Sequence, residues 1–90
     1  STEIAIWLRR NGTDVPWSNT DFYAQSNSVK NVATINWFMP VECVEGVCDE
    51  YEIMWAADNS NVELLAVPEE PGRPAIPSII LTVNQVGTLP

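Results

Sequence analysis

Hydrophobic and polar residues alternate at the start of the chain. The alternation separates Ile4, Ile6 and Leu8 from Ala5, Trp7 and Arg9. A two-residue period is the spacing of a strand with one face toward a core, so it predicts a strand and disfavours a helix. The Asn11-Gly12 pair that follows tolerates the positive φ that a type I′ turn needs at both central positions. We expect a hairpin here, with an extended run restarting at Val15 because the next residue is a proline.

The rest of the chain repeats this order of strand and turn. Further strands are predicted around Phe22-Tyr23-Ala24 and at Val29–Pro40, Glu50–Ala57, Val62–Val67 and Ile79–Val86. Pro68–Pro77 contains four prolines and is expected to be a loop. No segment predicts a helix, so the pattern favours an all-β antiparallel sandwich or barrel.

Three of these runs predict which side chains share a face. In Val29–Pro40, one face of the predicted strand holds Val29, Ala33, Ile35, Trp37 and Met39. In Glu50–Ala57, one face holds Tyr51, Ile53, Trp55 and Ala57. The closing run Ile79–Val86 is apolar on both faces. That pattern predicts a strand that is buried on both sides, or on one side with a partner on the other.

The length and net charge of the chain exclude several classes of function. The 90 residues are enough for one domain, residues 1–90. The net charge of −8 with only four cations excludes nucleic-acid binding and attraction to anionic membranes. No apolar run approaches the ~20 residues of a membrane span. Histidine is absent, which removes histidine bases, histidine-dependent triads and histidine metal ligands. We assign no catalytic residue, metal or cofactor and expect a protein that is not an enzyme.

Two cysteines flank a short turn. Cys43 and Cys48 are separated by four residues, a spacing that brings cross-strand side chains of a hairpin within bridging reach. The pair is interpreted either as a disulfide or as two small apolar thiols at a hairpin end. Acidic residues surround the same turn: Glu42, Glu45, Asp49, Glu50 and Glu52. A solvated acidic face, a calcium site and a pair of carboxylates for glycoside hydrolysis are the alternatives for them, and the first is favoured.

Four tryptophans are many for this length: Trp7, Trp17, Trp37 and Trp55. They are interpreted either as packing in a core or as a subunit interface or sugar-stacking platform, since both functions use large rigid aromatic area. The candidate interface residues are Trp7, Trp37, Trp55, Ile80 and Thr82.

Three ordered segments resemble a known module. Ile4 to Thr20 reads IAIWLRRNGTDVPWSNT and is similar to a "WLRKNGTDVPxSNT" pattern. Glu52 to Trp55 resembles the strand "YxEIMW", and Pro74 to Val86 resembles the closing pattern "PAIPSVILTVxQV". Together they resemble a jelly-roll module in virion proteins of tailed phages, especially marine and cyanobacterial ones. The resemblance spans nearly the whole chain.

This resemblance implies a tumour-necrosis-factor-like jelly roll without enzymatic activity. Such a module is usually a homotrimer that decorates the capsid or forms part of a head or tail fibre, so its location is the virion and its partners are other virion proteins. The alternative is a domain at a tail-fibre tip that binds a host receptor or a glycan. The family normally has further strands before this region, so we expect the chain to be the C-terminal portion of a longer one. The cysteine-bearing hairpin Val41–Asp49 departs from the short Gly-Asp turn that is common there.

Overall fold

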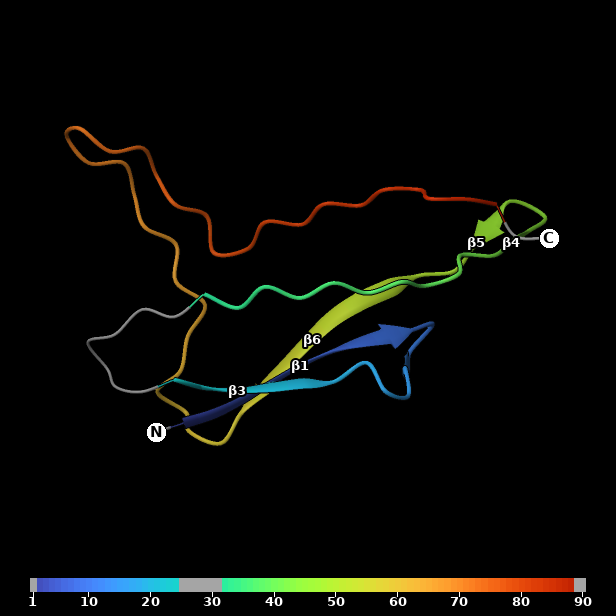
Figure 1. Ribbon diagram of the computed structural model, residues 1–90, viewed down its shortest axis with the longest axis horizontal. Coiled ribbons are helices and arrows are strands. Elements are labelled where there is room, and N and C mark those ends of the chain that lie inside the picture. Colours follow the sequence, from blue (N-terminus) through green and yellow to red (C-terminus); the bar gives the residue numbers. More distant parts are fainter. Residues whose placement is uncertain (1, 25–31, 89–90) are drawn as a thin grey trace. The chain divides into compact units, whose positions relative to one another are not determined.

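The computed structural model describes residues 2–24 and 32–88, and every regular element in them is a β-strand (Figure 1). The strands are β1 (Thr2–Arg10), β2 (Thr13–Asp14), β3 (Thr20–Ala24), β4 (Cys43–Val44), β5 (Val47–Cys48) and β6 (Tyr51–Ala57). All strand pairs are antiparallel, and the described residues contain no helix. The all-β antiparallel part of the predicted fold class is confirmed. A second full sheet that completes a jelly-roll sandwich is not evident in this part of the chain.

The chain divides into two compact units, Ser1–Ser60 and Asn61–Pro90. All six strands belong to the first unit. The second unit contains two isolated antiparallel bridges, Val67 with Ile76 and Glu70 with Arg73, at the predicted proline-rich loop. Each unit is therefore described by itself, and a single domain over residues 1–90 stays a prediction.

β1 is the centre of the sheet because it pairs along both edges. On one edge β6 runs antiparallel to it, with Ile4 opposite Ala57, Ile6 opposite Trp55 and Leu8 opposite Ile53. Opposite residues of a ladder point to the same face, so the predicted apolar faces of the two strands form one surface. On the other edge β1 pairs first with β2 and then with β3.

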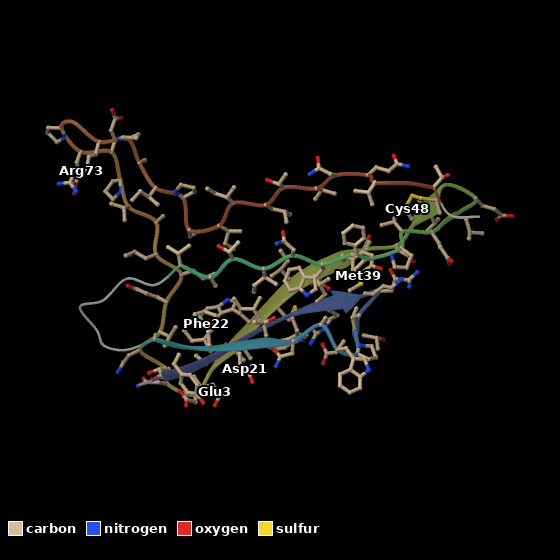
Figure 2. All side chains as sticks on the ribbon, viewed as in Figure 1. Glu3, Asp21, Phe22, Met39, Cys48 and Arg73 are labelled. Atoms are coloured by element: carbon tan, nitrogen blue, oxygen red, sulfur yellow. A yellow bond between two sulfur atoms is a disulfide. The ribbon has the colours of Figure 1, made fainter. Side chains whose placement is uncertain are left out.

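The β3 strand follows the same alternation. Phe22 lies opposite Ile4 and shares its face, whereas Asp21 lies opposite Ala5 on the other face. Figure 2 shows Phe22 and Asp21 on opposite sides of the strand. The sheet thus has one face that carries Ile4, Leu8 and Phe22 and a second face that carries Ala5 and more polar neighbours.

Both tight hairpins have the backbone that their sequences require. Asn11 and Gly12 have φ of 49° and 84° between the paired Arg10 and Thr13, which confirms the predicted type I′ turn. The β4–β5 hairpin repeats this geometry with Glu45 at 52° and Gly46 at 81°. Positive φ at both central residues matches the twist of the flanking strands, so each turn fixes the register of its hairpin.

The edge formed by β2 and β3 is interrupted by a bulge, which we define as residues 15–19. Arg9 pairs with Asp14 and Ile6 pairs with Thr20, so these five residues stand opposite only Trp7 and Leu8 of β1. Extra residues on one strand of an antiparallel pair leave ladder groups unpaired and bend that strand. The bulge therefore needs another source of hydrogen bonds for β1.

Ser18 supplies those hydrogen bonds. Its hydroxyl Oγ accepts from the Leu8 amide at 3.0 Å and donates to the Val15 carbonyl oxygen at 2.8 Å. The Val15 amide in turn donates to the Leu8 carbonyl oxygen at 2.9 Å. Ser18 is only 2% exposed, so its hydroxyl replaces a backbone ladder partner inside the protein. The neighbouring Trp17, at φ 66°, is turned fully into solvent.

Residues 32–42 follow the described part of β3 in the chain but form no strand. The predicted alternation is present in the burial pattern, since Ile35, Trp37 and Met39 are half-buried and their neighbours are exposed. The predicted strand Val29–Pro40 is nevertheless wrong for residues 32–40, because none of them enters a ladder. Its first residues, including Val29, lie outside the described residues. A two-residue period reports which way side chains face and carries no information on which backbone partner is available.

Two further predicted strands are also wrong. Val62–Val67 contributes a single bridge at Val67, and Ile79–Val86 enters no ladder. The closing run was expected to be buried, yet Ile80 and Val83 in it are exposed. The described part of the unit 61–90 contains no strand, so within this unit the two runs have no sheet edge with which to pair.

We expect Ser18→Ala to destabilise the protein by about 1–3 kcal/mol, because it leaves the Leu8 amide without an acceptor in a buried position. Urea unfolding at one fixed protein concentration measures this change. Thr20→Ala is the control, since Thr20 is exposed on the same edge. Equal stability of Ser18→Ala and the control contradicts the assignment of Ser18 as a ladder substitute.

A pair of substitutions tests the backbone at Trp17. We expect Trp17→Gly to be more stable than Trp17→Ala by about 1 kcal/mol, because only alanine keeps a Cβ in the left-handed region. Both variants remove the indole, so the difference isolates the backbone. Thermal unfolding of the two proteins gives the comparison, and identical stabilities refute a left-handed residue 17.

Candidate functional site

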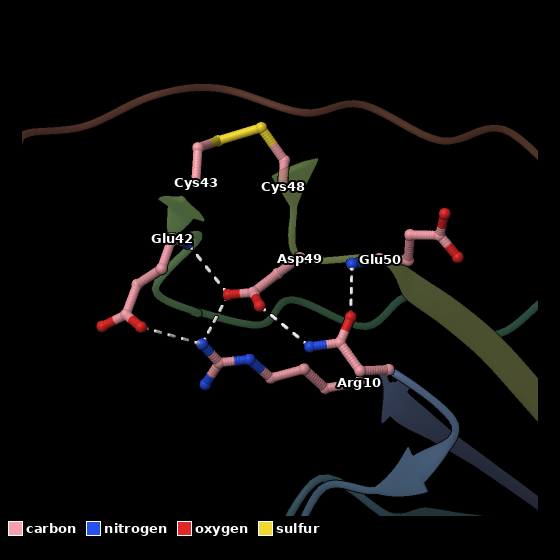
Figure 3. Close-up of a disulfide and its surroundings, with 7 residues drawn as sticks. Arg10, Glu42, Cys43, Cys48, Asp49 and Glu50 are labelled. Carbon is pink, nitrogen blue, oxygen red and sulfur yellow. Dashed lines mark hydrogen bonds and ion pairs between the residues drawn. A yellow bond between two sulfur atoms is a disulfide. The ribbon is translucent and has the colours of Figure 1, made fainter. Parts of the chain in front are cut away.

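The two cysteines form a staple at one end of the sheet. Cys43 and Cys48 lie opposite each other in the β4–β5 hairpin and are joined by a disulfide with an S–S distance of 2.02 Å (Figure 3). Of the two interpretations of the pair, the structure contains the disulfide. The disulfide links the two strands of the hairpin, and Asp49 is the next residue after Cys48.

Asp49 is the centre of a hydrogen-bond network, which we call the Asp49 network. Its Oδ1 accepts from Asn11 Nδ2 at 2.9 Å, and its Oδ2 accepts from the Glu42 backbone amide at 2.9 Å and from Arg10 Nη2. The hydrogen bond from Asn11, the one from the Glu42 amide and the one from Arg10 together lower the pKa of Asp49 to about 2. The carboxylate is therefore ionised at neutral pH, and it accepts three hydrogen bonds (Figure 3).

The network ties two hairpins together. Asn11 lies in the β1–β2 turn, and its side-chain Oδ1 accepts from the Glu50 backbone amide at 2.9 Å. The Asn11 backbone amide donates to the Glu50 carbonyl oxygen at 2.8 Å. Arg10 also lies 5.8 Å from the centroid of the Tyr51 ring. Tyr51 donates its hydroxyl to the Pro40 carbonyl oxygen at 2.6 Å. These bonds hold the staple against the end of β1 and give it a structural role.

The acidic residues around the staple do not converge on a metal position. Both carboxylate oxygens of Asp49 accept hydrogen bonds from protein donors. Glu42 Oε2 lies 3.9 Å from Arg10 Nη2. Among the described residues no group of three or more potential metal ligands is present. Glu42, Glu45, Glu50 and Glu52 are exposed, whereas Asp49 is half-buried within its network.

An open groove lies beside the bulge, on the face of the sheet that carries Ala5. We call it the Trp17 groove. It has a volume of about 270 Å³ and is lined by Ala5, Trp7, Asp14, Val15, Trp17 and Asn19. The lining combines two indoles with a carboxylate and a carboxamide. The groove exists because the bulge turns Trp17 outward beside the strand residue Trp7.

Hydrogen bonds fix the polar wall of the groove. Asp14 Oδ1 accepts from Trp7 Nε1 at 2.8 Å and from Arg9 Nε at 3.1 Å. The hydrogen bond from Trp7, followed by the one from Arg9, lowers the pKa of Asp14, so its carboxylate is ionised at neutral pH. Asn19 donates from Nδ2 to Asp21 Oδ1 at 2.8 Å. These bonds orient Trp7, Asp14 and Asn19, three of the residues that line the groove.

The five candidate interface residues lie in different segments of the chain and in both units. Trp7 belongs to the Trp17 groove, while Trp55 lies on the opposite face of the sheet, across from Ile6. Trp37 is half-buried and donates from Nε1 to the Ser18 carbonyl oxygen at 2.9 Å. Ile80 and Thr82 are exposed in the second unit. No described contact brings all five together.

Sequence reasoning missed the residues that build the groove. Trp17 was considered only as one of four tryptophans for packing, an interface or sugar stacking, and Asp14 was not considered, because an extended run was expected to restart at Val15. The signal was present in Val15-Pro16-Trp17-Ser18: a large aromatic residue sits between a proline and a serine in a segment that follows a strand. Such a segment suits a bulge, which re-aims a side chain.

The Asp49 network predicts a pH dependence of stability. The folded-state pKa of about 2 lies below the ordinary 3.8, so the stabilisation is present above about pH 4 and is lost as pH falls through about 2. Asp49→Asn should therefore lower the melting temperature at pH 7 and lose that deficit progressively between about pH 4 and pH 2. Thermal unfolding across this range measures it.

The matched control is Glu63→Gln, an exposed acidic residue of the second unit. It should leave the dependence of melting temperature on pH as it is in the wild-type protein. A deficit for Asp49→Asn that stays constant from pH 7 to pH 2 contradicts the assigned role of the carboxylate.

Comparisons with known proteins complete the description of the site. No protein-family model, curated protein or solved structure matches this chain. In the described part of the chain, no helix has the length and apolar character needed to cross a membrane.

Proposed function

We propose that this chain is a non-enzymatic structural module of a tailed-phage virion, active as a homotrimer in capsid decoration or in a fibre. The three ordered segments at residues 4–20, 52–55 and 74–86 support the family, since they resemble a jelly-roll module of such virions. The complete jelly roll is part of the proposal, with its second sheet completed on assembly with other copies of the chain.

The observation that carries the proposal is the small core of the described residues. Ile4 and Leu8 are the only buried hydrophobic side chains in residues 2–24 and 32–88. Trp55 and Ile53 on the apolar face of β6 remain 38% and 39% exposed. Apolar surface that a chain leaves uncovered marks a site of association. A second copy of the same chain is the partner that a closed symmetric assembly provides.

The second unit carries an apolar surface of its own. Ile79, Ile80, Leu81, Val83 and Val86 are all exposed. The run resembles the closing strand of the phage module, and a strand of this composition is stable when it is paired and covered. In the proposed assembly both this run and the Trp55 face gain partners.

The polar side chains support a structural role over an enzymatic one. Arg10, Asn11 and Asp49 are engaged with each other and with the backbone around the staple, so they form a brace. The chain has no histidine to serve as a general base. Its acidic character does not favour nucleic-acid binding, which leaves protein surfaces of the virion as the partners.

Light scattering tests the trimer. The wild-type protein should have a mass of about 30 kDa, three times the 10.0 kDa of one chain. Trp55→Lys places a charge on the apolar face and should shift the mass toward the monomer. Trp17→Gly is the control and should remain trimeric, because Trp17 lies outside that face. A wild-type mass near that of one chain at micromolar concentration contradicts the proposal.

Mass spectrometry of purified particles tests the location. We expect the chain to be present in copy numbers divisible by three. Hundreds of copies per particle indicate head decoration, and a few threefold sets indicate a fibre. Absence from purified particles overturns the virion proposal.

A further inference from the structure

The Trp17 groove has no part in the proposed assembly. We propose that it binds a neutral saccharide, with a sugar ring stacked on the indole of Trp17 and a sugar hydroxyl donating to the carboxylate of Asp14. The groove lies wholly within the first unit, so the inference goes beyond the structural function and does not depend on it.

Trp17 contributes little to the stability of the described fold. Its side chain is 102% exposed, and its φ of 66° is a conformation that a bulky residue rarely adopts. Strained backbone and exposed aromatic area are both unfavourable for folding, and local strain of this kind concentrates at ligand sites. The geometry presents an indole face to solvent, which a ligand with an apolar face can cover.

Asp14 provides the polar half of the site. Both of its protein donors, Trp7 Nε1 and Arg9 Nε, bond to the same oxygen, Oδ1. The other oxygen, Oδ2, accepts no hydrogen bond within residues 2–24 and 32–88. A hydroxyl that donates to an ionised carboxylate forms a charge-assisted bond, which is stronger than a neutral one. The acceptor is held in place before binding, which reduces the entropy lost when the ligand is ordered.

A saccharide matches these two features together. A sugar ring presents C–H groups on its faces and hydroxyl donors around its rim, so it can stack on Trp17 while it bonds to Asp14. A purely apolar peptide would cover the ionised carboxylate without pairing it, which is costly. The formal charge of −8 disfavours sialic and uronic acids, so the ligand is a neutral sugar. The groove of about 270 Å³ is shallow and open to solvent, so it has room for one terminal ring and leaves the rest of an oligosaccharide in solvent.

The test uses the full chain on an array that carries neutral hexose and N-acetylhexosamine oligosaccharides beside sialylated and uronic-acid members. The wild-type protein should bind to the neutral oligosaccharides on the array. In solution, the neutral oligosaccharide that binds most tightly should reduce acrylamide quenching of tryptophan fluorescence. Trp17→Gly should raise the dissociation constant for this oligosaccharide at least about tenfold. Its circular dichroism spectrum should match that of the wild type, because glycine suits the backbone at this position.

Two further variants separate the polar contribution from general aromatic effects. Asp14→Asn should weaken neutral binding, since it removes the charge from the acceptor. Trp55→Phe is the matched control on the opposite face of the sheet and should bind as the wild type does. Retention of no neutral glycan, preference for acidic glycans, or equal binding by Trp17→Gly and wild type each overturns the inference. Failure of glycan binding leaves the trimer and particle measurements unaffected.

Discussion

The central strand β1 must have its backbone groups paired along both edges. One edge is regular, since β6 pairs with β1 from Ile4 to Arg10. The other edge is interrupted by the bulge, where five residues face two, and the hydroxyl of Ser18 takes the place of a strand partner for the Leu8 amide. An unpaired amide at a buried position costs free energy, so this one side chain allows the β2–β3 edge to follow the strand. The exposure of Trp17 and the groove beside it are consequences of the same interruption.

The far end of β1 is fixed by charge. Arg9 and Arg10 are consecutive, so their side chains leave the strand on opposite faces. Arg9 pairs with Asp14 in the Trp17 groove, and Arg10 pairs with Asp49 below the staple. Half of the cations of this acidic chain are thus placed at one position along the sheet. Each one holds a carboxylate that then accepts a further hydrogen bond from a neighbour, Trp7 or Asn11.

The regular part of the sheet could be predicted from sequence, because its signals are local. The alternation around Ile6 and in Glu50–Ala57 predicts β1 and β6, and Asn11-Gly12 predicts the turn that was found. The segment Val15-Pro16-Trp17-Ser18 suits a bulge, but the acceptor role of Ser18 depends on an amide ten residues away along the chain, which no local pattern reveals. The Trp17 groove was not predicted either, because it forms only where the bulge brings Trp17 and Asp14 beside Ala5 and Trp7 of β1.

The predicted strands that failed share a different cause. Residues 32–40 keep the expected alternation of half-buried and exposed side chains, yet they have no ladder partner. The run Ile79–Val86 has the composition of a buried strand and remains exposed. Composition and period describe what a segment needs, whereas pairing depends on whether another segment provides an edge. The described residues leave that need unmet, which is the physical reason to look for the partner in another chain.

The charge of the chain constrains how such a partner can bind. Identical copies with a formal charge of −8 repel one another at long range, so electrostatic attraction cannot drive their association. In the proposed trimer the favourable free energy would have to come from apolar area such as the Trp55 face, because salt screens the repulsion between copies without reversing it. A neutral sugar at the Trp17 groove faces no such repulsion. In the two proposals the net negative charge thus has different consequences: it opposes self-association at long range, and it leaves the binding of an uncharged ligand unaffected.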